Sequence, residues 1–279
     1  MTITVQSLLA DAARALSGIE SARLDAEVLL QNVLETERAW LYAHPTEIVA
    51  PGPASDFQRL VASRGRGLPL AYLVGFREFW SLPLKVDRST LIPRPETELL
   101  VEAGLRFLEG RDNPMVLDLG TGSGAIAIAT AKERPDAGVV GVDLSPEALA
   151  MARSNAGIHG LDRIDFRRSD WFAELHGECF DLILCNPPYV DGGDPILVEG
   201  ALRFEPRLAL DGGPGGLRAL RAVIDSAGRH LHAGGCLIME HGCDQAADVC
   251  MQFERAGFAG ITTLRDTADL ERVTFGIWR

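Results

Sequence analysis

Hydrophobic residues follow a helical period in the first part of the chain. Apolar side chains recur three or four positions apart around Val5 and Leu8, around Leu24 and Val28, and again around Phe57. This spacing places the apolar groups on one face of a helix, and Pro and Gly separate the successive runs. The pattern therefore predicts a small helical domain over residues 1–68.

After residue 68 the pattern changes to short alternating or continuous apolar runs. Residues 76–80 and 82–86 alternate as in a hairpin, so we take 69–95 to be a hairpin linker that faces the substrate. Strands are then predicted at 115–119, 138–144, 164–169, 180–185, 235–240, 260–265 and 272–278, with helices near 124–133, 146–157, 216–232 and 244–256.

Strands that alternate with helices are typical of a doubly wound, mostly parallel sheet. The last two predicted strands have no helix between them and would close the sheet as a pair. We therefore expect an α/β fold with a seven-stranded sheet over residues 96–279, preceded by the helical domain and the linker.

Composition places the chain among soluble globular proteins. It has 279 residues, 47% of them hydrophobic and 24% charged. No apolar run approaches the roughly 20 residues of a membrane span, and the first residues lack the basic segment of a signal peptide. Five cysteines without a C-x-x-C pair indicate reduced thiols in the cytoplasm. His241 and Cys243 are two metal-ligand types without further partners, so we expect no metal.

The net charge of −12 argues against nucleic acid as the partner. Residues 1–90 are almost balanced, so the negative charge belongs to residues 91–279, where the predicted sheet lies. A protein that binds a DNA duplex usually carries a basic stripe that neutralises phosphates, and this chain has none of any length. We expect neither DNA nor a membrane as a partner.

A glycine-rich segment follows the first predicted strand of the sheet. Glycines let the backbone turn tightly and approach a ligand, and the helix that follows offers free N–H groups. About 20 residues later a second strand ends in an acid suited to ribose hydroxyls, and a third ends in an acid and an indole suited to adenine. The candidate cofactor-binding residues are Asp118, Gly120, Thr121, Gly122, Ser123, Gly124, Asp143, Asp170 and Trp171.

Two cofactors have to be weighed for this segment. The spacing of Gly120, Gly122 and Ala125 fits the loose dinucleotide fingerprint, which would suggest NAD. However, Asp118 would lie close to a pyrophosphate, whereas it suits a cationic amino-acid group. No His or Lys constellation for hydride transfer stands out either. The residues favour S-adenosylmethionine over NAD, and purely structural glycine turns remain the plain alternative.

A second motif, Asn186-Pro187-Pro188-Tyr189, follows the apolar strand at 180–185. The Asn186 amide offers an acceptor and a donor but cannot act as a base near neutral pH. The two prolines fix the direction of the neighbouring carbonyls, and Tyr189 offers a flat face. A rigid pair of acceptors beside an aromatic ring suits the NH2 of a planar group. A simple Asn-Pro turn is the alternative.

With these motifs, the chain resembles the HemK/PrmC family of protein-(glutamine-N5) methyltransferases over nearly its full length. Further segments that carry the resemblance are 75–82, 91–98, Arg203-Phe204-Glu205-Pro206, Glu240-His241-Gly242 and Glu271-Arg272-Val273. Residues 212–216 depart from the family pattern, because they carry glycine where an acid is expected.

The resemblance implies transfer of a methyl group from S-adenosylmethionine to the glutamine side-chain amide in the Gly-Gly-Gln motif of class 1 peptide chain release factors. The product would be S-adenosylhomocysteine, the helical domain would dock the release factor, and the enzyme would act as a monomer. Asn186, Pro187 and Tyr189 would be catalytic, Asn186 would also contact the cofactor, and Pro188 and Arg94 would join the motif in substrate binding.

Three other functions stay open on the residues alone. An adenine-specific DNA methyltransferase shares the Asn-Pro-Pro-Tyr motif, because adenine also presents an amino group on a plane. A glutamine methyltransferase that acts on a ribosomal protein would share still more of the chain. A protein that binds S-adenosylmethionine without catalysis is the third.

Overall fold

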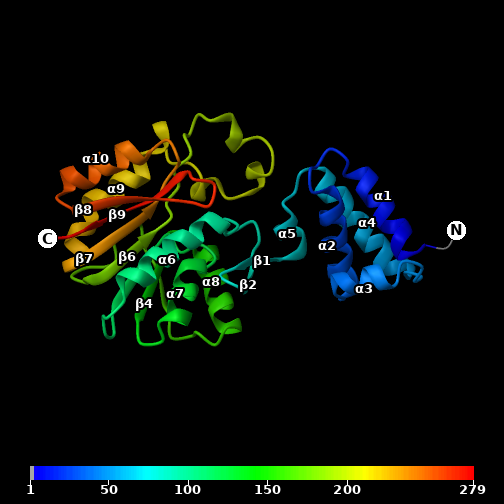
Figure 1. The fold of residues 1–279 in the computed structure, drawn as a ribbon, viewed down its shortest axis with the longest axis horizontal. Helices are drawn as coiled ribbons and strands as arrows, with labels where there is room; N and C mark the ends of the chain where they lie inside the picture. Colours follow the sequence, from blue (N-terminus) through cyan, green and yellow to red (C-terminus); the bar gives the residue numbers. More distant parts are fainter. Residues whose placement is uncertain (1–2) are drawn as a thin grey trace. The chain divides into compact units, whose positions relative to one another are not determined.

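The computed structural model describes residues 3–279, which divide into two compact units. The first unit ends at Phe76 and is helical, whereas the second begins at Arg77 and contains the large sheet (Figure 1). The expected end of the helical domain was residue 68, so the observed division falls later in the chain.

The helical unit is built around a core of buried apolar side chains that includes Leu8, Leu29 and Phe57. Thr4 caps the first helix by accepting a hydrogen bond from the Ser7 backbone N–H at 3.3 Å. Its helices are α1 (Val5–Ala15), α2 (Ala22–Leu34), α3 (Arg38–Ala43), α4 (Pro51–Gly65) and α5 (Leu70–Val74).

Two of these helices were not predicted. α3 has six residues and α5 has five, which is too short for a helical period to be recognised. Leu70, Leu73 and Val74 of α5 pack against the core of the helical unit. This packing explains why the unit extends beyond residue 68.

The second unit contains the expected seven-stranded sheet, in the order β5-β4-β3-β6-β7-β9-β8. All neighbouring strands are parallel except β9, which runs antiparallel to both β7 and β8. The strands are β3 (Met115–Leu119), β4 (Gly138–Asp143), β5 (Asp165–Arg168), β6 (Phe180–Cys185), β7 (Leu231–Glu240), β8 (Ala259–Arg265) and β9 (Glu271–Ile277). The predicted hairpin forms a separate two-stranded sheet of β1 (Phe76–Phe79) and β2 (Leu82–Lys85).

The prediction was wrong at the start of β7. A single helix was expected over 216–232, but α9 covers only Arg218–Ala227, and β7 begins at Leu231. Leu231 pairs with Phe180 of β6, with a register shift before the regular pairing resumes at Leu182. Pairing with a neighbouring strand therefore decides the conformation of residues that the local pattern assigned to the helix.

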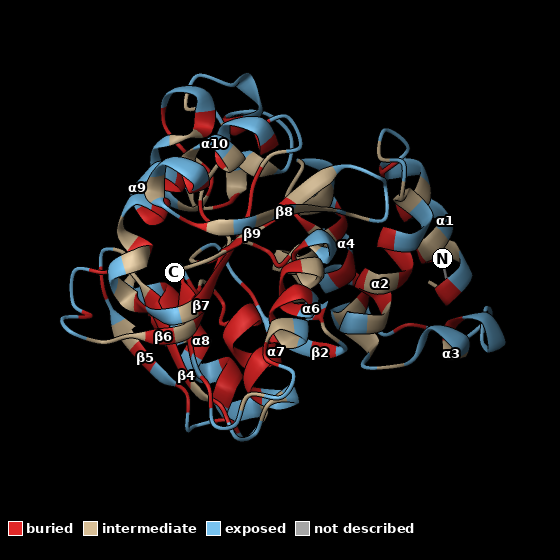
Figure 2. Cartoon of the chain, turned by 60° about the vertical axis from the view of Figure 1, so that its left-hand side comes forward, coloured by how far each residue is buried: buried red, intermediate tan, exposed pale blue. Residues whose placement is uncertain are grey.

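Each face of the sheet carries its own hydrophobic core, because successive side chains of a strand point to opposite faces. Val116 and Leu182 pack with α6 (Glu98–Phe107), α7 (Ala125–Glu133) and α8 (Pro146–Ile158). Leu117 and Ile183, one position further along, pack with α9 and α10 (Ala246–Ala256). In Figure 2 most of β6, β7 and α7 is red, that is buried, whereas the edge strand β8 is tan and pale blue.

The sheet positions a ligand site where its order reverses. From β3 the chain continues to β4 and β5 on one side, while β6 and β7 lie on the other. In open α/β sheets, ligands bind in the crevice outside the carboxyl ends of the strands at such a point. No helix within residues 3–279 is long and apolar enough to span a bilayer.

Candidate active site

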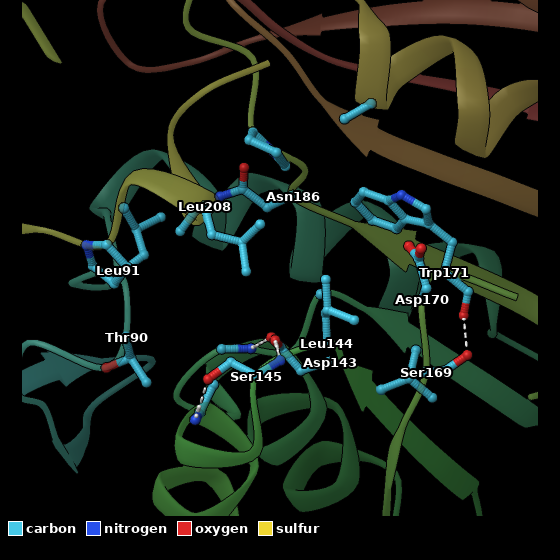
Figure 3. Close-up of a pocket in the computed structure, with 18 of the residues that line it drawn as sticks. Thr90, Leu91, Asp143, Leu144, Ser145, Ser169, Asp170, Trp171, Asn186 and Leu208 are labelled. Carbon is cyan, nitrogen blue, oxygen red and sulfur yellow. Dashed lines mark hydrogen bonds between the residues drawn. The ribbon is translucent and has the colours of Figure 1, made fainter. Parts of the chain in front are cut away.

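A cavity of about 610 Å³ opens at the carboxyl ends of β3 to β6. This volume is within the range of small-molecule sites in proteins. Figure 3 shows residues from the successive strand ends around it, including Asp143, Trp171 and Asn186. Of the expected site residues, the cavity is lined by Gly120, Gly122, Asp143, Asp170, Trp171, Asn186 and Pro188.

The glycine loop is tied directly to the end of the neighbouring strand. Gly120 and Gly122 both have a positive φ, of +74° and +55°, which residues other than glycine rarely adopt. The Gly122 backbone N–H donates to Asp143 Oδ2 at 2.9 Å, and the Ser145 N–H donates to Asp143 Oδ1 at 2.9 Å. Burial raises the pKa of the Asp143 carboxyl. Asp143 thus holds the loop and the start of α8 in fixed positions at the cavity.

Asp118 lies behind the loop and is fully buried. Its Oδ2 accepts hydrogen bonds from Thr121 Oγ1 at 2.6 Å and from the Ala127 backbone N–H at 3.1 Å. Its Oδ1 has no hydrogen-bond partner among residues 3–279. Burial raises the pKa of this carboxyl to about 7. The site therefore contains a buried acceptor whose capacity is only half used.

Three other residues of the glycine segment support the loop from behind. The Thr121 hydroxyl donates its hydrogen bond to Asp118, and the Ser123 carbonyl accepts a hydrogen bond from Asn155 Nδ2 at 2.9 Å. Gly124 precedes α7 as its N-cap with φ +84°, and a Cβ at this position would approach Ala152 within 3.2 Å. Within the described chain, neither these residues nor Asp118 line the cavity.

Trp171 and Asp170 form one wall of the cavity (Figure 3). Trp171 has φ +50°, and its carbonyl accepts a hydrogen bond from Ser169 Oγ at 2.7 Å. The same Oγ accepts from the Glu174 N–H at 3.1 Å, which fixes the turn after β5. A Cβ on Gly120 would lie 3.8 Å from the indole ring, so the loop and the ring are neighbours.

The Asn-Pro-Pro-Tyr motif starts directly after β6, as expected. Asn186 Nδ2 donates to Thr97 Oγ1 at 3.1 Å, and the Tyr189 hydroxyl donates to Glu240 Oε1 at 2.9 Å. Burial and the adjacent Glu240 raise the pKa of Tyr189, so its phenol stays protonated. Pro187 is buried and, in the part of the chain described, does not line the cavity; nor does Tyr189.

The backbone of this motif is braced by the glycine segment that departs from the family pattern. Gly216 has φ +69°, and a Cβ at this position would lie 2.0 Å from the Tyr189 carbonyl oxygen. Gln245 Nε2 donates to that carbonyl at 3.0 Å and to the Gly215 carbonyl at 3.1 Å. Glycine at residue 216 is therefore a steric requirement for the observed path of Tyr189.

Arg94 forms an ion pair with Glu205, at 2.5 Å between Nη2 and Oε1. The other carboxylate oxygen of Glu205 accepts from the Ile92 backbone N–H at 3.0 Å. The Glu205 side chain is 1% exposed, so this pair fixes residues 91–98 against residues 203–206. Within the described residues Arg94 does not line the cavity, and its substrate contact stays a prediction.

Several site residues were missed by sequence reasoning. Leu144 and Ser145 line the cavity and directly follow Asp143, so their place after a strand could have indicated them. Leu91 and Leu208 lie opposite Trp171 in Figure 3 and come from segments with no such signal. Thr97 and Glu240 were identified only as parts of the segments that carry the family resemblance, and not as site residues.

Comparison with known proteins matches both units. A family model described as PrmC N-terminal domain matches residues 7–75, and one described as methyltransferase domain matches residues 111–269. The release factor glutamine methyltransferase of Xylella fastidiosa strain Temecula1 is 48% identical over 254 residues, covering 91% of this chain and 92% of that protein. The protein of the same name from Escherichia coli K12 is 42% identical over 272 residues, covering 97% and 98%.

A solved structure shows the same fold with low sequence identity. The 16S rRNA methyltransferase of Thermus thermophilus aligns with a TM-score of 0.52 and 22% identity, covering 73% of this chain and 50% of that one. The seven-stranded sheet is therefore of the methyltransferase kind.

Proposed function

The chain belongs to the release factor glutamine methyltransferase family, and we propose that it methylates the side-chain amide of the glutamine in the Gly-Gly-Gln motif of class 1 peptide chain release factors. The methyl donor is S-adenosylmethionine. The observation that carries the proposal is one cavity that joins the glycine loop, Asp143 and Trp171 to Asn186. Donor and acceptor sites thus share a single space at the carboxyl edge of the sheet.

The residues around the cavity fit the donor. Asp143 can accept from ribose hydroxyls, since its two oxygens accept from the Gly122 and Ser145 backbone N–H groups and each has a further lone pair. Asp170 and the Trp171 indole match the amino edge and the face of adenine. Asp118, whose Oδ1 has no hydrogen-bond partner among residues 3–279, suits the cationic amino-acid end of the donor. The glycine loop lies between Asp118 and the cavity. S-adenosylmethionine supplies an electrophilic methyl group when bound.

Asn186 and Pro187 orient the acceptor. A glutamine amide nitrogen is a poor nucleophile, because its lone pair is delocalised into the carbonyl. We assign Asn186 Oδ1 and the Pro187 carbonyl to accept the two amide hydrogens, which raises the electron density on nitrogen and aims it at the methyl group. Tyr189 packs beside the amide plane and keeps the reacting atoms aligned. The proton then leaves more easily from the methylated nitrogen, so no base is needed beforehand.

The same proposal extends to surroundings and partners. The helical unit docks the release factor, Arg94 keeps the lip at residues 91–98 in place for it, and the enzyme acts as a monomer in the cytoplasm. All five cysteines are free thiols, as a reducing compartment would keep them.

The test is methyl transfer from radiolabelled S-adenosylmethionine to four acceptors in parallel. These are a purified class 1 release factor, its Gly-Gly-Gln variant with Gln replaced by Ala, ribosomal proteins and unmethylated DNA. We expect label on the intact factor alone. Label on the Ala variant would overturn the choice of acceptor residue, and label only on DNA or on a ribosomal protein would overturn the substrate.

A further inference from the structure

Two buried residues outside the cavity connect Asn186 and Tyr189. Thr97 precedes α6 and is 4% exposed, and Glu240 ends β7 and is 1% exposed. Thr97 Oγ1 lies 2.6 Å from Glu240 Oε2 and 3.1 Å from Asn186 Nδ2. Tyr189 donates its hydroxyl to the other oxygen, Glu240 Oε1, at 2.9 Å. One carboxylate therefore terminates two chains of hydrogen bonds, one from each end of the motif.

The direction of these hydrogen bonds follows from the number of protons. Burial raises the pKa of the Glu240 carboxyl, whereas its hydrogen bonds from Thr97 and Tyr189 and the charge of Arg272 favour the ionised form. The ionised carboxylate only accepts, so in that form the single hydroxyl proton of Thr97 points to Glu240. The Thr97 oxygen can then only accept from Asn186, which forces the NH2 group and not the carbonyl oxygen toward Thr97. Asn186 Oδ1 is left on the other side of the amide. Asparagine orientation is fixed by such networks and not by shape, since oxygen and NH2 are nearly the same size.

We propose that Thr97 and Glu240 are positioning residues that hold the Asn186 carbonyl oxygen toward the substrate amide and lock Tyr189 beside it. The inference rests on the proposed function, because it assigns Asn186 Oδ1 the same task. If the side-chain amide of Asn186 were rotated by 180°, its NH2 group would face the NH2 group of the substrate glutamine. Two hydrogen-bond donors would then oppose each other, and Asn186 would no longer offer an acceptor. Thr97 and Glu240 lie in two of the segments that carry the family resemblance. Their contact gives both segments the same role, which is to orient Asn186.

The decisive variant is Thr97→Val, which keeps the shape of the side chain but removes the hydroxyl. Asn186 can then adopt either orientation, and we expect kcat for release factor methylation to fall roughly tenfold, as loss of one oriented hydrogen bond implies. The Kd for S-adenosylmethionine, measured by calorimetry, should stay within about twofold. Thr97→Ser restores the hydroxyl and should recover most of kcat.

Thr130→Val is the matched control. Thr130 is also a buried threonine, 1% exposed in α7, but its hydroxyl has no hydrogen-bond partner among residues 3–279. Its replacement should leave kcat unchanged. A loss in Thr130→Val equal to that in Thr97→Val would mean that removal of any buried hydroxyl disturbs the enzyme, and would overturn the proposal.

Glu240→Gln tests the carboxylate itself. Its amide offers one acceptor and one donor where two acceptors are needed, so the hydrogen bond to either Thr97 or Tyr189 must reverse its direction. We expect a loss of kcat at least as large as in Thr97→Val, with cofactor affinity retained. Full kcat in Thr97→Val with an active wild type would sink the inference and leave the proposed function intact. A wild type inactive on release factors would instead refute the proposed function.

Discussion

The two sides of the cavity are built in different ways. On the cofactor side the supporting hydrogen bonds span shorter stretches of chain: Thr121 donates to Asp118 three residues away, the Gly122 N–H donates to Asp143 21 residues away, and Asn155 donates to the Ser123 carbonyl 32 residues away. On the acceptor side, Asn186 reaches Thr97 over 89 residues, and Thr97 reaches Glu240 over 143. A loop that presents backbone groups can be specified by a short motif, whereas an oriented side-chain amide needs partners from other elements. The two sides should therefore fail separately when residues are changed.

We expect Asn186→Ala to give the largest difference between its effect on catalysis and its effect on cofactor binding. It removes the proposed acceptor of the glutamine amide, and kcat should fall by about 100-fold or more, as for loss of a group that acts in the transition state. The Kd for S-adenosylmethionine should change much less, since the glycine loop, Asp143 and Trp171 stay in place. Single-turnover methylation and calorimetry on the same preparation measure both. Unimpaired turnover would refute the role of Asn186.

Gly216→Ala should disturb the acceptor side of the cavity by displacing the backbone of Tyr189. The new methyl group would clash with the Tyr189 carbonyl, and the residue would be held at positive φ, so we expect a loss of about 2–4 kcal/mol in the free energy of unfolding. Gly215→Ala is the matched control. Gly215 has φ +65° with no atom within 4 Å of the new Cβ, so it reports backbone strain alone. Denaturant unfolding of the two variants separates the clash from the strain, and equal losses would contradict the clash.

Asp118→Asn should affect the cofactor side and depend on pH. With a pKa of about 7, Asp118 is mostly protonated at pH 6 and about half ionised at pH 7, while an α-amino group stays mostly cationic, so attraction of this ligand group should strengthen about fivefold over this interval. Calorimetric titration with S-adenosylmethionine should show this in the wild type and not in Asp118→Asn. An identical pH profile in both proteins would remove Asp118 from cofactor binding.

The same carboxyl also affects stability without ligand. Its pKa is higher in the folded than in the unfolded chain, so the folded state holds the proton more tightly. This contribution to stability is complete below the unfolded pKa near 4 and is lost as the pH rises through about 7. The melting temperature of ligand-free Asp118→Asn should therefore fall less than that of the wild type between pH 5 and pH 8.

Tyr189→Phe is expected to have the smallest effect. The ring and its packing remain, and only the hydrogen bond to Glu240 is lost, so kcat should fall about fivefold, as for a single hydrogen bond of about 1 kcal/mol. Cofactor affinity should not change. A loss as large as that of Asn186→Ala would mean that the hydroxyl itself takes part in the reaction.

The sequence by itself determined most strands of the large sheet and the residues at its carboxyl edge. Strands β3 and β6 were predicted at their observed bounds, because each is an apolar run ended by a glycine loop or by proline. The seven-stranded sheet was predicted, since alternation of strands and helices is a property of short windows of sequence. The strand-end residues Gly120, Asp143, Trp171 and Asn186 were predicted to gather, and one cavity contains them all.

Tertiary structure alone decided the rest, because it depends on contacts between residues distant in the chain. Pairing of Leu231 with Phe180 extended β7 into the expected helix, and packing of the short α5 extended the helical unit. The partners of Asn186 could not be found from its neighbours, since Thr97 and Glu240 belong to a helix start and a strand end far away in the sequence. A local pattern can indicate that an amide lies at a site, but only the folded chain decides which way it points.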